Sequence, residues 1–193
     1  MMTMKTYLFT LILLGIGLHS LAQEKWALDK SHSKIGFSVL HMGISEVEGY
    51  FKDFESSVTT SNNFQEADIT FVAKAASIYT DNERRDTHLK SDDFFNAEKF
   101  PELKFTGKLV KENNAYSLKG KLTIRDVTKD VVFQVVYGGR INTGRGEKAG
   151  FKISGEINRL DYGLKWENKL STGEWVVSEK VDLICKIELN LQP

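Results

Sequence analysis

Residues 181–191, VDLICKIELNL, decide the fold class, because apolar and polar side chains alternate along nearly the whole stretch. An alternation with a period of two is typical of a β-strand that has one buried and one solvated face. We therefore predict a strand here and expect its apolar face to point into the interior of the molecule. That face consists of Val181, Leu183, Cys185, Ile187, Leu189 and Leu191.

The same alternation recurs from residue 33 onward and predicts further strands. Asn113 and Asn114 separate two of them and predict a hairpin turn, while residues 125–130 predict another turn. A polar tail at residues 56–63 is expected to end one strand unit, and residues 138–150 are expected to form a glycine- and charge-rich loop. The expected strands lie near residues 33–42, 47–51, 67–74, 103–106, 116–124, 131–137, 151–157 and 181–191.

A count of about eight strands joined mostly by short turns indicates an all-β fold with a short helical excursion, an antiparallel meander that closes into a barrel. A β-sandwich is the alternative. The barrel is favoured because six phenylalanines lie on the apolar faces of their own strands. A barrel of about eight strands either fills its interior with side chains or encloses one small ligand, and the alternation does not decide which. The six are Phe37, Phe51, Phe71, Phe105, Phe133 and Phe151.

Residues 84–105, RRDTHLKSDDFFNAEKFPELKF, interrupt the strand pattern with arginines, a histidine, acids and aromatics. Just before them, Thr80 and Glu83 have the spacing of a capping box, which predicts a short helix that begins near Asp81. Ser91, followed by two aspartates, is expected to cap a second helix. The proline near the end of the segment favours a return to an extended strand.

The N-terminal residues have the pattern of a secretory signal peptide. Lys5 precedes an apolar run of about a dozen residues, and small residues stand at positions 20 and 22. The run is shorter than the roughly 20 residues that a membrane-spanning helix needs, so no stable membrane insertion is expected. We predict that residues 1–22 are cleaved and that residues 23–193 form a single barrel domain in the periplasm or outside the cell.

Composition narrows the function classes. The chain has 26 basic and 26 acidic residues, and this neutrality argues against nucleic acid as a partner. Its single cysteine, Cys185, excludes an internal disulfide framework, and the apolar face on which it lies predicts a buried, unreactive thiol.

Four stretches, residues 26–43, 84–105, 122–129 (LTIRDVTK) and 158–163 (NRLDYG), together resemble the YceI-like family of secreted bacterial proteins. The resemblance covers essentially the whole chain after the signal peptide. It implies a lipocalin-like eight-stranded antiparallel β-barrel with a helical segment and a long apolar tunnel. It also implies binding of polyisoprenoids or other long-chain amphiphilic lipids. The family usually has glycine where this chain has Asp126, but aspartate tolerates a left-handed backbone, so the turn is expected to survive.

The expected site is the barrel interior, with the helical excursion as a lid. The ligand's tail is expected to contact inward apolar side chains, and its head to contact polar ones, because a guanidinium fork suits phosphate and carboxylate. The alternative is that Arg84 and Arg85 pair with nearby aspartates and that Arg159 pairs with Asp161. The candidate apolar lining is Phe37, Val39, Phe51, Phe71, Phe94, Phe95, Phe105, Phe133, Phe151 and Trp175. The candidate head-group contacts are His41, Arg84, Arg85, His88 and Arg159.

Catalytic chemistry has weaker support. Three histidines, His32, His41 and His88, match the ligand count of many zinc sites, but no two have the spacing of a metalloprotease motif. A G-x-S-x-G elbow is absent from the sequence. We therefore predict no catalytic residue, no metal and no cofactor.

The predicted function is non-catalytic carriage or sequestration of a long-chain amphiphilic lipid of polyisoprenoid type. One alternative is a hydrolase or other enzyme that acts on an amphiphilic substrate through His32, His41, His88 and nearby acids. Another is an interaction protein with a solid interior and a partner surface at residues 138–150. The expected partner is a long-chain isoprenoid or similar lipid. A second copy of the chain, in a homodimer, is a further candidate partner.

Overall fold

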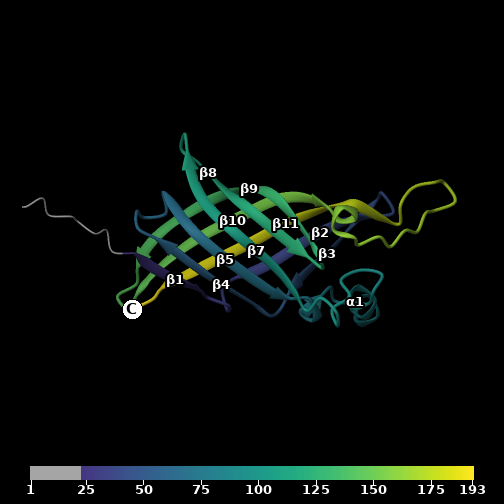
Figure 1. Cartoon of the computed structure of the whole chain (residues 1–193), viewed down its shortest axis with the longest axis horizontal. Coiled ribbons are helices and arrows are strands. Elements are labelled where there is room, and N and C mark those ends of the chain that lie inside the picture. The colour runs from purple at the N-terminus through teal and green to yellow at the C-terminus, as the bar shows by residue number, and fades with distance from the viewer. Residues whose placement is uncertain (1–22) are drawn as a thin grey trace, which may run out of the picture.

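Eleven strands make one antiparallel sheet in the computed structural model, which describes residues 23–193 (Figure 1). Their bounds are β1 (Glu24–Leu28), β2 (Lys34–His41), β3 (Ser45–Phe51), β4 (Phe54–Thr60), β5 (Glu66–Lys74), β6 (Ile78–Tyr79), β7 (Glu102–Glu112), β8 (Ala115–Ile124), β9 (Val127–Asn142), β10 (Glu147–Asn158) and β11 (Val177–Leu191). Eight of them, β1, β4, β5 and β7 to β11, form a closed barrel, because β1 pairs with β4 on one edge and with β11 on the other. The predicted eight-stranded antiparallel barrel is confirmed.

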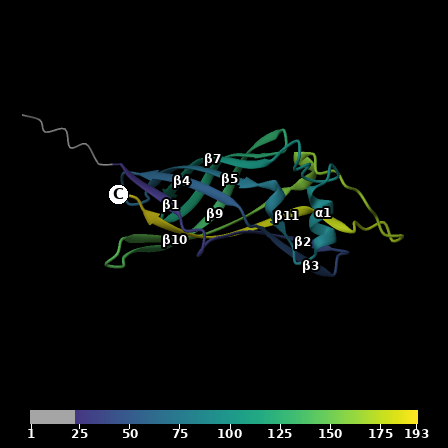
Figure 2. The same cartoon turned by 90° about the horizontal axis from the view of Figure 1, so that it is seen from below.

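Strand β11 pairs with two strands along one edge, which extends the barrel wall. Its last residues pair with β1, where Leu189 lies opposite Leu28, and its earlier residues pair with β2, where Leu183 lies opposite Phe37. Strands β3 and β6 continue the sheet from β2. They lie at the end of the barrel that carries the helix α1 (Glu83–Lys90), opposite the C-terminus (Figures 1 and 2).

The prediction that residues 56–63 form a polar tail is wrong, because most of them belong to β4. Val58 is buried, and the hydroxyls of Ser56 and Thr60 donate hydrogen bonds to backbone carbonyls of β5 at 2.9 and 2.7 Å. A hydroxyl that is paired in this way can occupy a buried strand position at little cost. Alternation of apolar and polar residues therefore does not reveal this strand.

The predicted loop at residues 138–150 is also wrong, because β9 and β10 form a long hairpin through most of it. The register shifts between Gly150 and Phe151, and Gly139 has a φ of 111°. The glycines therefore accommodate a bulge in the paired strands, which is a common role for glycine within a sheet.

Two tight turns lie close to their expected positions. Asn113 and Asn114 both have left-handed backbones, with φ of 49° and 64°, as the predicted hairpin requires. The turn predicted at residues 125–130 is shorter, because β9 already begins at residue 127. Arg125 has the left-handed φ of 56°, so the strained position of this turn is Arg125, one residue before Asp126.

The predicted capping box before α1 is wrong. Asn82 caps the helix, and its side-chain oxygen accepts a hydrogen bond from the Arg85 amide at 2.9 Å. Thr80 is buried instead, with its hydroxyl donating to the Asp86 carboxylate at 2.6 Å. Asparagine is as good a cap as threonine, and the burial of Thr80 depends on tertiary packing.

The segment after α1 contains turns in place of the predicted second helix. Ser91 ends α1, and its hydroxyl donates to the His88 carbonyl at 2.8 Å. Strand β7 begins right after Pro101, as predicted. Within residues 23–193, no helix has the length and apolar character required to cross a membrane.

The end of the barrel near the C-terminus is filled by aromatic rings. We call Trp26, Phe64, Tyr137 and Phe151 the aromatic plug. The Phe64 ring centroid lies 5.0 Å from those of Trp26 and Phe151 and 5.8 Å from that of Tyr137. Trp26 and Phe64 are only 1% and 0% exposed, so these two rings are shielded from solvent, while Tyr137 and Phe151 are half-buried.

Two inward phenylalanines pack against glycines on the neighbouring strand. A Cβ at Gly155 would lie 2.4 Å from Cδ1 of Phe133, and a Cβ at Gly49 would lie 2.4 Å from Cζ of Phe37. Because these glycines have no side chain, the rings can approach the wall of the barrel. This packing leaves space at the centre.

Candidate functional site

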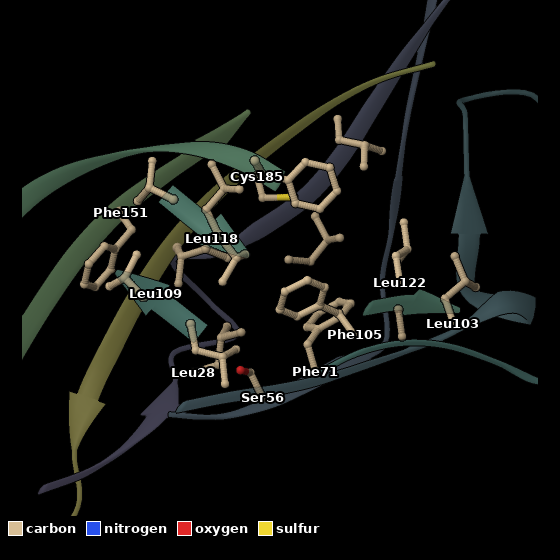
Figure 3. Close-up of a pocket in the computed structure, with 18 of the residues that line it drawn as sticks. Leu28, Ser56, Phe71, Leu103, Phe105, Leu109, Leu118, Leu122, Phe151 and Cys185 are labelled. Carbon is tan, nitrogen blue, oxygen red and sulfur yellow. The ribbon is translucent and has the colours of Figure 1, made fainter. Parts of the chain in front are cut away.

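An apolar cavity of about 160 Å³ lies within the barrel, and we call it the tail chamber (Figure 3). Apart from the Ser56 hydroxyl and the Cys185 thiol, every side chain in its wall is a hydrocarbon. A wall of this kind repels water and favours apolar groups. The six phenylalanines that the alternation predicts to point inward all line the chamber: Phe37, Phe51, Phe71, Phe105, Phe133 and Phe151.

A second cavity, of about 270 Å³, lies beneath residues 83–100, which we call the lid. We name this cavity the lid chamber. Its polar side chains are those of His41, Thr80, Arg85, His88 and Arg159. The two chambers are adjoining parts of one interior, because they share the wall residues Phe37, Phe51, Leu103, Ile124, Ile157 and Leu183.

Most of the predicted site residues are brought together around these chambers. Val39, Phe94 and Phe95 line the lid chamber, as do four of the five candidate head-group contacts. Their place in the wall is a structural finding, whereas their contact with a ligand stays a prediction.

Two predicted site residues lie outside both linings. Trp175 belongs to a loop beyond the barrel, where it pairs with Lys169, whose ammonium lies 4.3 Å from the Trp175 ring centroid. Arg84 lies on the exposed side of α1. Adjacent residues of a helix point about 100° apart, so Arg84 cannot share the inward direction of Arg85.

Arg85 connects the lid to the barrel through Thr80. Its Nε donates to the Thr80 hydroxyl at 2.8 Å and its Nη2 to the Thr80 carbonyl. The predicted ion pairs of Arg84 and Arg85 with nearby aspartates are not formed in the described part of the chain. Asp92 pairs with Arg125 instead, at 3.0 Å.

Arg159 has backbone carbonyls as partners in place of the predicted Asp161. Its guanidinium donates four hydrogen bonds of 2.7 to 3.2 Å, and the side chain is 3% exposed. Desolvation lowers the pKa of this guanidinium from its ordinary value. The four acceptors are the carbonyls of Leu164, Trp166, Val177 and Ser178.

Arg125, which sequence reasoning did not select, holds the lid to the barrel rim. Its Nη1 donates to the carbonyls of Asp92, Phe94 and Gly163 at 3.0 to 3.1 Å. The residue lies in one of the four stretches that carry the family resemblance, but a turn position alone gave no sign of these contacts.

Replacing Arg125 with methionine is expected to loosen the lid. Loss of charge-assisted bonds to carbonyls should lower the free energy of unfolding by about 1–3 kcal/mol. Hydrogen exchange should accelerate at the amides of Phe95, Ala97 and Phe100, which bond within the lid. Arg145→Met, in the exposed turn between β9 and β10, is the control. Unchanged lid exchange in Arg125→Met would show that packing alone holds the lid.

His88 packs among aromatic rings at the edge of the lid chamber. Its ring centroid lies 5.1 Å from Phe94 and 5.5 Å from Trp166, both in edge-to-face orientation. Its Nε2 lies 2.8 Å from a carboxylate oxygen of Asp93. One edge of this imidazole is therefore held by an acid while the residue contributes to the chamber wall.

The Cys185 thiol faces the tail chamber (Figure 3). Burial among hydrocarbon side chains raises the thiol pKa to about 11. The thiol is therefore neutral at physiological pH. Because the thiolate is the reactive form, we expect Cys185 to be unreactive in the folded protein.

We expect the native protein to resist alkylation by iodoacetamide at pH 8. The same protein in denaturant should react at the rate of a free cysteine, because the apolar surroundings are then lost. Mass spectrometry of timed samples measures both rates. Equal rates in the native and denatured states would contradict the assigned environment.

The structure does not bring the three histidines together. His41 and His88 line the lid chamber, whereas the His32 Nδ1 lies 3.1 Å from Asp29 and 3.7 Å from Glu188. The Lys148 ammonium already contacts both of these acids, at 2.9 and 2.6 Å. A lysine thus supplies the positive charge that an ion would otherwise bring to this cluster.

A family model described as a YceI-like domain matches residues 26–189. The chain belongs to the YceI-like family. A UPF0312 protein of Photorhabdus laumondii is 37% identical over 170 residues, which cover 86% of this chain and 85% of that protein.

Solved YceI-like structures share the barrel. The YceI protein of Campylobacter jejuni is 34% identical with a TM-score of 0.70, covering 86% of this chain and 97% of that one. A structure from Saccharophagus degradans, described as a polyisoprenoid binding domain, has a TM-score of 0.62 and covers 86% of this chain and 98% of that one. Its 14% identity makes the second likeness one of fold alone. The family predicted from four sequence stretches is thus confirmed.

Proposed function

We propose that this YceI-like chain is a non-catalytic binding protein that carries or sequesters a long-chain amphiphilic lipid of polyisoprenoid type. The tail chamber is the observation that carries the proposal, because its wall is hydrocarbon apart from one hydroxyl and one thiol. Each CH₂ group of a buried tail contributes roughly 0.8 kcal/mol, so affinity would come mainly from the tail.

Two further observations support this function. The tail chamber adjoins the lid chamber, where polar side chains gather, and an amphiphile has the same division between tail and head. The Saccharophagus degradans neighbour is described as a polyisoprenoid binding domain, which adds a likeness of fold.

Native mass spectrometry of the protein, followed by organic extraction, tests the proposal. We expect a lipid adduct in the purified protein, or uptake of a long-chain isoprenoid alcohol when the empty protein is challenged. Ser56→Leu places a larger side chain in the tail chamber and should reduce uptake. Ser57→Leu is the matched control, because the next residue of β4 is exposed on the opposite face. A purified protein that carries no lipid and takes up none on challenge would contradict the proposal.

The enzyme alternative has less support from the geometry. His32 is separate from His41 and His88, and no acid belongs to the wall of either chamber. Ester hydrolysis that is lost in His88→Ala, with the barrel intact by circular dichroism, would favour the enzyme.

The site of action is proposed to be the periplasm or the exterior of the cell. This proposal rests on the signal-peptide pattern of residues 1–22, which lie outside the described residues. N-terminal sequencing of the protein from its own cells should find Gln23 first. Retention of Met1 in the mature protein would contradict it.

A further inference from the structure

The lid chamber has two guanidinium groups in its wall and, among the described residues, no carboxylate. Two arginines and two histidines line it, together with Thr80, and none of the lining residues is an aspartate or glutamate. The tail chamber next to it offers only the Ser56 hydroxyl and the Cys185 thiol. Polar recognition in this interior is therefore concentrated under the lid.

Arg159 is a buried cation without a carboxylate partner. Within the described residues, its guanidinium contacts four backbone carbonyls and no acid lies within 4.0 Å of it. Glu167 and Glu179 act on it only from a distance. Carbonyl dipoles solvate the cation but leave its net charge in place, so the wall of the lid chamber contains a guanidinium without an ion-pair partner.

Arg85 adds a second guanidinium that is only partly used. Its Nε and Nη2 donate to Thr80, while its Nη1 donates to no protein atom in residues 23–193. Asp86 offsets part of this charge, but its carboxylate is buried and bonded to the Thr80 hydroxyl, and it does not line the chamber. Arg85 therefore retains one nitrogen without a protein partner in the described residues, and no carboxylate among them lines the lid chamber.

The two histidines complete the polar wall. The His88 Nε2 is held by Asp93, and the His41 ring makes no hydrogen bond within residues 23–193. An imidazole nitrogen can donate or accept, so His41 can complete the coordination of a head group.

We infer that the lid chamber binds an anionic head group, a carboxylate or a phosphate monoester, of an amphiphile whose single tail enters the tail chamber. The inference rests on the proposed function and deepens it, because lipid binding by itself requires no charge on the head. The tail chamber leaves no room for a second tail, because its volume of about 160 Å³ is close to that of an apolar cavity known to hold one benzene. Guanidinium donors to an anion make charge-assisted hydrogen bonds, which are stronger than those to a neutral alcohol.

Four ligands with the same tail test the head-group preference: hexadecanoate, hexadecyl phosphate, hexadecan-1-ol and hexadecylamine. Calorimetric titration at pH 8, below the critical micelle concentrations, gives the four dissociation constants. We expect the two anions to bind at least about tenfold more tightly than the alcohol, and the amine to bind more weakly than the alcohol.

Arg85→Met and Arg84→Met form a matched pair for the same titrations. Methionine retains the apolar stem and removes the charge, so Arg85→Met should lose most of the preference for anions over the alcohol. Arg84→Met should behave as the wild type, because Arg84 lies outside the chamber wall. Arg85→Lys should retain part of the preference, since it keeps a donor and a charge.

The outcomes separate the inference from the proposed function. If none of the four ligands binds, lipid binding itself fails. If all four bind with equal affinity, the protein binds lipids and the anionic head group is wrong. Displacement of hexadecanoate by inorganic phosphate at a concentration similar to that of the lipid would identify a site for small anions and overturn the inference. If Arg85→Met does not fold, the four dissociation constants of the wild-type protein still test the preference for an anionic head group.

Discussion

Replacing Arg159 with methionine is expected to lower the free energy of unfolding by about 3–5 kcal/mol, because four buried carbonyls lose a charged hydrogen-bond donor. The guanidinium is the common donor for four carbonyls, which belong to Leu164, Trp166 and the start of β11. Methionine fills a similar volume and offers no donor. Each buried carbonyl left without a partner costs roughly 1–3 kcal/mol, less whatever water recovers.

Urea unfolding followed by tryptophan fluorescence measures this change. For a chain of this length, the melting temperature should fall by roughly 6–20 °C. Arg84→Met removes the same group from an exposed position and should change stability by less than about 0.5 kcal/mol. A loss below about 1 kcal/mol in Arg159→Met would mean that water replaces the guanidinium at all four carbonyls.

The second large effect is expected from Trp26→Ala, which removes a ring of the aromatic plug that is almost as deeply buried as Phe64. Trp26 is 1% exposed, its ring centroid lies 5.0 Å from Phe64, and the Arg140 guanidinium lies 5.0 Å from its ring. Truncation of a buried tryptophan to alanine costs about 3–5 kcal/mol, because hydrocarbon contacts are lost and a cavity remains.

The same truncation at Trp175 provides the comparison for Trp26→Ala. Trp175 is half-buried in a loop outside the barrel, so Trp175→Ala should cost far less. Equilibrium unfolding of both variants measures the difference. Equal losses of stability would show that the plug does not hold the end of the barrel. Loss of lipid retention in Trp26→Ala would add that the plug also closes the cavity.

The alternation of apolar and polar residues predicted correctly which side chains face the interior, wherever that alternation is strict. In β11 and at the six inward phenylalanines, the side-chain direction follows from the period of two, and all six line the tail chamber. The prediction failed in β4, where Ser56 and Thr60 face inward. Their hydroxyls bond to carbonyls of β5, a partner that becomes available only when the strands pair.

The partners of the charged side chains were the least predictable part of the site. Arg84 and Arg85 are neighbours in sequence, yet one is exposed and the other lines the lid chamber. Arg125 lies within a predicted turn, but it binds carbonyls of the lid from 31 and 33 residues away. Long side chains reach partners that are distant in sequence, so local spacing does not identify them.

By itself, the sequence determined the all-β class and the inward phenylalanines, because backbone period and turn chemistry are local properties. The resemblance of four stretches to the YceI-like family added the closed eight-stranded barrel. Only the tertiary structure decided that the interior contains two adjoining chambers, that glycines let phenylalanine rings pack against the wall, and that the lid chamber has cations without acids in its lining. Cavities and unpaired charges depend on how side chains from distant strands fill a shared volume, and no local pattern encodes that sum.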